Sequence, residues 1–155
     1  MPDLLTHYTA AYFLTPKRLF PRHRVLVYLG TILPDVITRP IYILMPSLER
    51  YTVAIHTPVF MLIFCLLLSE FFQSPKSAKV RAFLLFGVGL HFFLDFFQRH
   101  FIGGYYWLFP FSWDYFEIGL FWPETPLLLS PLWLLMIAVS EGWLYLQKRK
   151  VNQRF

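Results

Sequence analysis

An apolar segment at residues 82–100 constrains this chain most, because a histidine and an aspartate interrupt it. His91 and Asp95 are four residues apart, so in a helix their side chains project from the same face, one turn apart. An ionised carboxylate at mid-membrane costs about 2.5–3.5 kcal/mol on insertion scales and therefore needs a partner. A metal ion is such a partner, because it compensates the carboxylate and binds imidazole nitrogen. The alternative is a plain imidazole–carboxylate hydrogen bond that stabilises a helix bundle.

The composition of the whole chain is that of a membrane protein. Its 155 residues are 57% hydrophobic and 15% charged, compared with about 25% charged residues in an average soluble domain. Eleven of the 14 lysines and arginines lie in three short clusters between long apolar segments, at residues 17–24, 76–81 and 148–154. This distribution does not form the continuous basic stripe of a nucleic-acid-binding protein, and it follows the positive-inside rule. We therefore expect a multi-pass protein of the cytoplasmic (inner) membrane with its C-terminus in the cytoplasm and no nucleic-acid partner.

The apolar segments predict an all-α, polytopic membrane helix bundle that forms a single integral membrane domain over residues 1–155. A helix of about 20 residues crosses a hydrocarbon core about 30 Å thick. Four spans are expected on this basis, at residues 25–45, 53–72, 82–100 and 127–147. Residues 3–15 are too few to cross, so they are expected to form a short N-terminal half-helix packed into the bundle.

Two prolines are expected to interrupt the first span. Pro34 and Pro40 remove backbone donors, and a broken membrane helix survives only where protein or water covers the freed carbonyls. Such breaks often lie beside binding sites. Asp35 follows the first proline, and Arg39 is one turn further along. The simpler interpretation of Arg39 is an ion pair with Asp35; the alternative is a clamp for a substrate phosphate, since guanidinium binds phosphate oxygens in a bidentate manner.

The predicted topology brings several polar side chains to similar depths. With the basic clusters in the cytoplasm, Asp35 and His91 both lie about 15 Å above the inner face. Two further histidines, His7 and His56, are expected near the same level, and Asp95 is one turn further out. Singly, His7 also fits a polar position of an amphipathic helix, and His56 fits a helix start near water. Together, the five side chains predict a divalent-metal site open to the outer face of the membrane.

Five ordered motifs then resemble a known family. They are Thr-His at residues 6–7, Gly-Thr-Ile-Leu-Pro-Asp at 30–35, Ile-His-Thr at 55–57, Gly-Leu-His-Phe-Phe-Leu-Asp at 89–95 and Trp-Leu-Phe-Pro-Phe-Ser-Trp at 107–113. Over roughly residues 5–114, this order resembles the YdjM-like predicted membrane-bound metal-dependent hydrolases. The His-x-x-x-Asp element is also similar to that of zinc-dependent phospholipase C and the S1/P1 nucleases. The resemblance implies one or two divalent ions, most simply zinc, with these ligands: His7, Asp35, His56, His91 and Asp95.

The expected activity is hydrolysis of a phosphoester by metal-activated water, because zinc lowers the pKa of a bound water to about 7. The partners would be membrane lipids, and the substrate a phospholipid or a lipid-linked phosphate. Asp35 and Asp95 are the candidate catalytic bases, and Ile37 stands where family members usually carry a second aspartate. His100 is a possible sixth ligand. The candidate substrate-binding residues are Arg39, Arg99 and Trp113.

Two other functions fit the same residues. A small intramembrane metal or proton transporter would use the same ligands, and a catalytically inactive structural membrane protein would use the polar cluster only to fix helix packing. A transporter needs polar residues that continue towards the opposite face of the membrane. Between Ala82 and His91 there are none, since Gly87 and Gly89 are the only residues there that are not bulky. This absence favours the enzyme.

Overall fold

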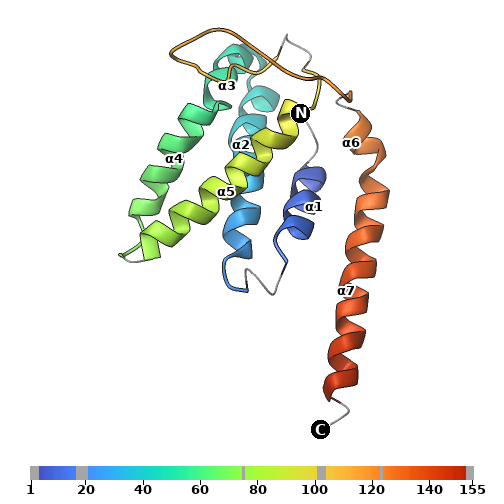
Figure 1. Ribbon diagram of the computed structural model, residues 1–155. Helices are drawn as coiled ribbons and strands as arrows, with labels where there is room; N and C mark the ends of the chain where they lie inside the picture. Colours follow the sequence, from blue (N-terminus) through green and yellow to red (C-terminus); the bar gives the residue numbers. More distant parts are fainter. Residues whose placement is uncertain (1–3, 17–20, 75, 101–103, 123, 153–155) are drawn as a thin grey trace.

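The computed structural model describes residues 4–16, 21–74, 76–100, 104–122 and 124–152, and the described part is all-α (Figure 1). The prediction of an all-α chain is therefore confirmed for these residues. Their helices are α1 (Leu4–Leu14), α2 (Arg24–Leu44), the 3-10 turn η1 (Pro46–Leu48), α3 (Glu49–Ile55), α4 (Pro58–Glu70), α5 (Lys76–Phe96), α6 (Thr125–Leu128) and α7 (Ser130–Asn152).

The segment expected to form the second span, residues 53–72, is two helices that meet at His56 and Thr57. Pro58 has no N–H and disfavours a helical conformation in the residue before it. Thr57 is accordingly extended, with φ −126° and ψ 150°, and its hydroxyl caps α4 by accepting a hydrogen bond from the Phe60 N–H. The break places His56 at the joint between α3 and α4, where its side chain is free to turn into the bundle.

The interruption expected in the first span does not occur, because α2 is continuous and contains both Pro34 and Pro40. The cost of a proline in a membrane helix falls where neighbouring groups satisfy the backbone again. Pro34 and Pro40 lack the N–H groups that would donate to the Gly30 and Val36 carbonyls. The Thr38 hydroxyl adds a separate 2.8 Å hydrogen bond to the Pro34 carbonyl. The helix thus carries Asp35 on an ordered turn rather than on an unwound one.

The helices α2 and α5 form the centre of the bundle, and they cross at two glycines. A Cβ atom on Gly30 would lie 2.3 Å from the Leu84 carbonyl oxygen, and one on Gly87 would lie 2.3 Å from the Val27 carbonyl oxygen. Small residues at a helix crossing allow the backbones to approach this closely. The close crossing brings residues 31–38 of α2 against the second half of α5.

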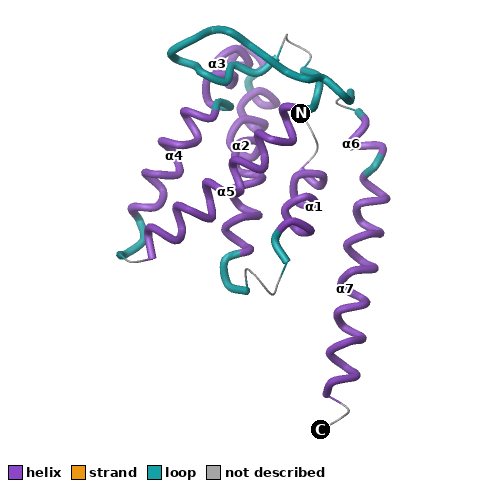
Figure 2. Tube along the Cα trace, in the orientation of Figure 1, coloured by secondary structure: helices purple, strands orange, loops and turns teal. Residues whose placement is uncertain are grey.

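One helix among the described residues is long and apolar enough to cross a membrane, by length and composition: α5. The shorter helix α4 is also apolar. In Figure 1, α7 lies along one side of the bundle, next to α1. The described residues 104–122, between α5 and α6, pass over one end of the bundle (Figure 2). Among them, the Tyr105 ring lies 5.9 Å from the His56 ring, and the Trp107 ring lies 5.2 Å from the Phe96 ring at the end of α5.

Candidate metal centre

Five predicted ligands, far apart in the sequence, meet inside the bundle. We call them the His–Asp centre: His7 on α1, Asp35 on α2, His56 at the α3–α4 joint, and His91 and Asp95 on α5. His56 is 7% exposed and the other four are fully buried. Charged and polar groups are rarely buried without partners, so five together at one point indicate a common function.

The Asp95 carboxylate is the focus of the centre. Its Oδ2 atom lies 2.9 Å from Nε2 of His56 and 3.2 Å from Nε2 of His91, and its Oδ1 atom lies 3.3 Å from Nε2 of His7. The two nitrogen atoms Nε2 of His56 and His91 are themselves 3.2 Å apart. One carboxylate therefore faces one nitrogen from each of three imidazoles.

In His56 and His91, the ring nitrogen that faces away from Asp95 is Nδ1. In each ring this atom has a partner that indicates whether Nδ1 carries the hydrogen. Nδ1 of His91 lies 2.8 Å from the Thr31 carbonyl oxygen, which only accepts, so this nitrogen donates. The Thr38 hydroxyl gives its hydrogen to Pro34, which leaves its oxygen as an acceptor for Nδ1 of His56 at 3.5 Å. In neutral rings of this form, both Nε2 atoms present lone pairs to the lone pairs of Asp95. A cation at this point resolves the conflict between these acceptors.

A second set of potential ligand atoms lies beside the first. The His7 ring stacks on the His91 ring with centroids 4.0 Å apart. His7, Asp35 and His91 offer ligand atoms that all lie within 4.8 Å of one another, as do His56, His91 and Asp95. Two buried atoms of these side chains have no hydrogen-bond partner, Nδ1 of His7 and Oδ1 of Asp35. Oδ1 of Asp95 faces only Nε2 of His7, at 3.3 Å. Since unpartnered buried acceptors are costly, they too favour a cation.

The residues present therefore fit a divalent metal. Imidazole nitrogen and carboxylate oxygen are the ligands of zinc and related ions, and catalytic zinc sites leave one position for water. Histidine ligands usually donate their other ring N–H to a carbonyl or hydroxyl group, which orients the ring. The contacts of His91 with Thr31 and of His56 with Thr38 have this form. The unpartnered Oδ1 of Asp35 supports the same fit.

Thr38 offers a direct test of the outer contacts. Thr38→Val removes the acceptor for Nδ1 of His56 and is expected to weaken metal binding by about 10–100-fold, the usual effect of losing such a partner. Thr31→Val is the matched control, because its hydroxyl only donates back to the Val27 carbonyl, while its own carbonyl still accepts from His91. Competition with a chromogenic chelator measures both affinities. Equal metal affinity in the two variants would show that the Thr38 hydroxyl does not support metal binding.

The predicted substrate-binding residues lie outside the centre. Arg39 forms a 2.7 Å ion pair with Oδ2 of Asp35, the simpler of its two interpretations. The Arg99 guanidinium lies over the Trp122 ring, 4.6 Å from its centroid, and its Nε donates to the Gly119 carbonyl. Trp113 is 70% exposed and its ring contacts Phe109. Of these three residues, only Arg39 contacts a residue of the His–Asp centre in the described part of the chain.

Two further residues lie against the centre from the segment after α5. The Tyr105 ring lies 5.9 Å from the His56 ring and 4.9 Å from the His100 ring. Burial, followed by the charges of Asp95 and Asp35, raises the pKa of Tyr105 far above its usual value, so its phenol remains a donor. Sequence reasoning missed Tyr105, because an aromatic residue in an aromatic loop carries no distinguishing signal.

The described fold is a helix bundle that encloses a polar centre. Comparison with protein families makes the assignment more specific. The model of the family described as YdjM inner membrane protein matches residues 4–153, so the chain belongs to that family. No curated protein and no solved structure matches it significantly.

Proposed function

We propose that this protein is a membrane-embedded, metal-dependent hydrolase that acts on a phosphoester such as a phospholipid or a lipid-linked phosphate. The convergence of three imidazoles and two carboxylates on one buried point carries the proposal. A structural hydrogen-bond cluster does not need several acceptors facing one another, whereas a metal site does. The position of the centre in a family of inner membrane proteins makes a membrane lipid the accessible substrate.

The bound metal, most simply zinc in one or two copies, would supply Lewis acidity and water with a pKa near 7. The residues around it have separable roles. Asp95 would hold the metal together with the three histidines. Asp35 has one unpartnered oxygen and would accept a proton there, while Arg39 holds its other oxygen. Tyr105, which stays protonated, would donate a hydrogen bond to a substrate oxygen.

The membrane arrangement is part of the same proposal. We propose four spans, with the basic end of α7 in the cytoplasm and the His–Asp centre towards the outer face. Three features support it: the apolar character of α4 and α5, Arg149 and Lys150 in the last turn of α7, and strongly exposed apolar side chains. Leu67 on α4 is 63% exposed and Phe93 on α5 is 60% exposed. Hydrocarbon covers such side chains more favourably than water does.

Hydrolysis by the protein purified in detergent tests the proposal. Release of phosphate or of the phosphorylated headgroup from a phospholipid should require the metal, so a chelator should abolish it and added zinc should restore it. His91→Ala should abolish it permanently. His23→Ala is the matched control, because this ring stacks on Phe83 outside the centre. Stoichiometric metal without hydrolysis of any phosphoester, or hydrolysis indifferent to the chelator, would contradict the proposal.

A further inference from the structure

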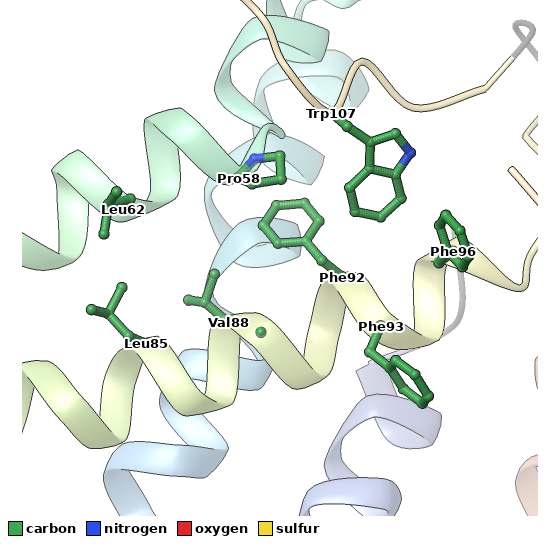
Figure 3. A pocket seen from close by; sticks show the side chains of 9 residues that line it. Pro58, Leu62, Leu85, Val88, Phe92, Phe93, Phe96 and Trp107 are labelled. Carbon is green, nitrogen blue, oxygen red and sulfur yellow. The ribbon is translucent and has the colours of Figure 1, made fainter. Parts of the chain in front are cut away.

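An apolar groove runs between α4 and α5 and ends under Trp107 (Figure 3). Its volume is about 450 Å³, within the range of about 300–1,000 Å³ that ligand sites occupy. All its lining side chains are apolar or aromatic; they include Pro58 and Leu62 of α4 and Leu85, Phe93 and Phe96 of α5. The Trp107 N–H donates to the Phe116 carbonyl and therefore does not offer a polar group to the groove. We call this space the α4–α5 groove.

We propose that the α4–α5 groove holds one hydrocarbon chain of a membrane phosphoester lipid. That this lipid is the substrate of the His–Asp centre rests on the proposed function. The groove lies along α5, the helix with the length and composition of a membrane span, so in the proposed membrane arrangement the surrounding medium would be hydrocarbon. A groove without polar lining groups selects an alkyl chain over any polar or charged ligand.

One wall of the groove is also a wall of the His–Asp centre. The Phe92 ring lies 5.5 Å from the His56 ring and 5.4 Å from the His91 ring, measured between centroids. Pro58, on the opposite wall, follows His56 by two residues. This shared wall would bring the polar end of a lipid whose chain occupies the groove near the candidate metal ligands.

The length of the groove suits a single chain. Along α5 it extends from Leu85 to Phe96, which corresponds to about 17 Å of helix. Half of a hydrocarbon core about 30 Å thick is about 15 Å. The groove thus matches the depth of one leaflet, which is the depth that one acyl chain reaches.

A second apolar cavity of about 340 Å³, lined by residues of α1, α6 and α7 and by Leu94, Phe121 and Leu129, is the competing location. One helical turn or so beyond it, the Tyr12 hydroxyl donates to Glu141 at 2.6 Å and lies 3.1 Å from the Ser140 hydroxyl, which ties α7 to α1. None of the ring contacts between the described residues joins its lining to the imidazoles of the centre, whereas Phe92 touches two of them. The α4–α5 groove is therefore the better placed of the two.

Gly89 allows the groove to be filled without disturbing the bundle. It lines the groove, and a Cβ atom added there would meet no atom within 4 Å. Gly89→Trp should raise KM for a long-chain phospholipid by about tenfold or more, since each buried methylene contributes about fourfold. It should leave metal content and the hydrolysis of a short, water-soluble phosphoester within twofold. Gly142→Trp is the matched control, because a Cβ on this α7 glycine also meets nothing within 4 Å.

A binding readout separates the groove from the activity. A phospholipid with a diazirine in its acyl chain, irradiated with the protein in lipid nanodiscs, should label peptides of α4 and α5 that line the groove. Gly89→Trp should reduce this label about tenfold, and Gly142→Trp should not. Label on the α1–α7 cavity, or label spread evenly over the exposed faces and unchanged by Gly89→Trp, would overturn the assignment. Label in the groove without any hydrolysis would overturn the hydrolase and support the lipid site.

Discussion

Asp95→Asn is expected to release the metal and to lower phosphoester hydrolysis by at least about 100-fold. The loss follows from position, because this carboxylate faces Nε2 of His56, His91 and His7 at 2.9, 3.2 and 3.3 Å. Removing a group that only orients a ligand already costs about 10–100-fold in affinity or activity, so removing the shared carboxylate should cost more. An asparagine amide also replaces one carboxylate oxygen, which accepts, with an NH₂ group, which donates and cannot bind a metal. This group would face the lone pairs of the imidazole nitrogens.

The measurement is metal content by mass spectrometry, together with the rate of hydrolysis, on protein purified in the same detergent. Asp114→Asn is the matched control, since this exposed carboxylate accepts a hydrogen bond from Ser112 at the far side of the loop. The control should keep the metal and the activity of the parent protein. Full metal content in Asp95→Asn would show that Asp95 is not a ligand.

Gly87→Ala is expected to destabilise the protein by about 3 kcal/mol, the upper part of the range for overpacked cores. The new Cβ would lie 2.3 Å from the Val27 carbonyl oxygen and 2.8 Å from the Thr31 nitrogen, which are backbone atoms that have no space to move. The helices α2 and α5 must separate. Because the Thr31 carbonyl orients His91, the separation should also weaken metal binding.

Gly89→Ala, two residues along the same helix, is the matched control. Its Cβ meets nothing, and alanine has the higher helix propensity by up to about 1 kcal/mol, so this variant should be as stable as the parent or slightly more so. Thermal unfolding in detergent, followed by circular dichroism, compares the two. Equal midpoints for Gly87→Ala and Gly89→Ala would show that the close crossing of α2 and α5 does not hold the bundle together.

Much of the site was predictable because its ligands follow local rules. The spacing of His91 and Asp95 places both on one helical face in any helix, and the structure keeps that relation. The prediction of the other three candidate ligands depended on the order of the motifs along the chain and on their approximate depths in the membrane. The structure brings all five together, although the sequence carries no direct information on the packing of α1 against α5.

The parts that sequence reasoning missed depend on tertiary contacts. Pro34 and Pro40 predict a broken helix, yet α2 is continuous through both, and its close packing against α5 at Gly30 and Gly87 is a tertiary contact. The segment around His56 has the sequence pattern of one apolar helix. In the structure, Pro58 and the extended Thr57 separate it into α3 and α4. Tyr105 lies in a loop, and no local sequence pattern predicts the path of this loop over the bundle.

The most direct test of the central claim is X-ray absorption at the metal edge, recorded on the purified protein together with its metal stoichiometry. We expect one or two ions per chain, zinc being the simplest, with nitrogen and oxygen ligands at about 2.0–2.2 Å and no sulfur. The sulfur of Cys65, the only cysteine in the chain, lies in the hydrophobic core. Protein that carries no metal after purification with zinc present, or a ligand shell with sulfur at about 2.3 Å, would show that the His–Asp centre is not the metal site.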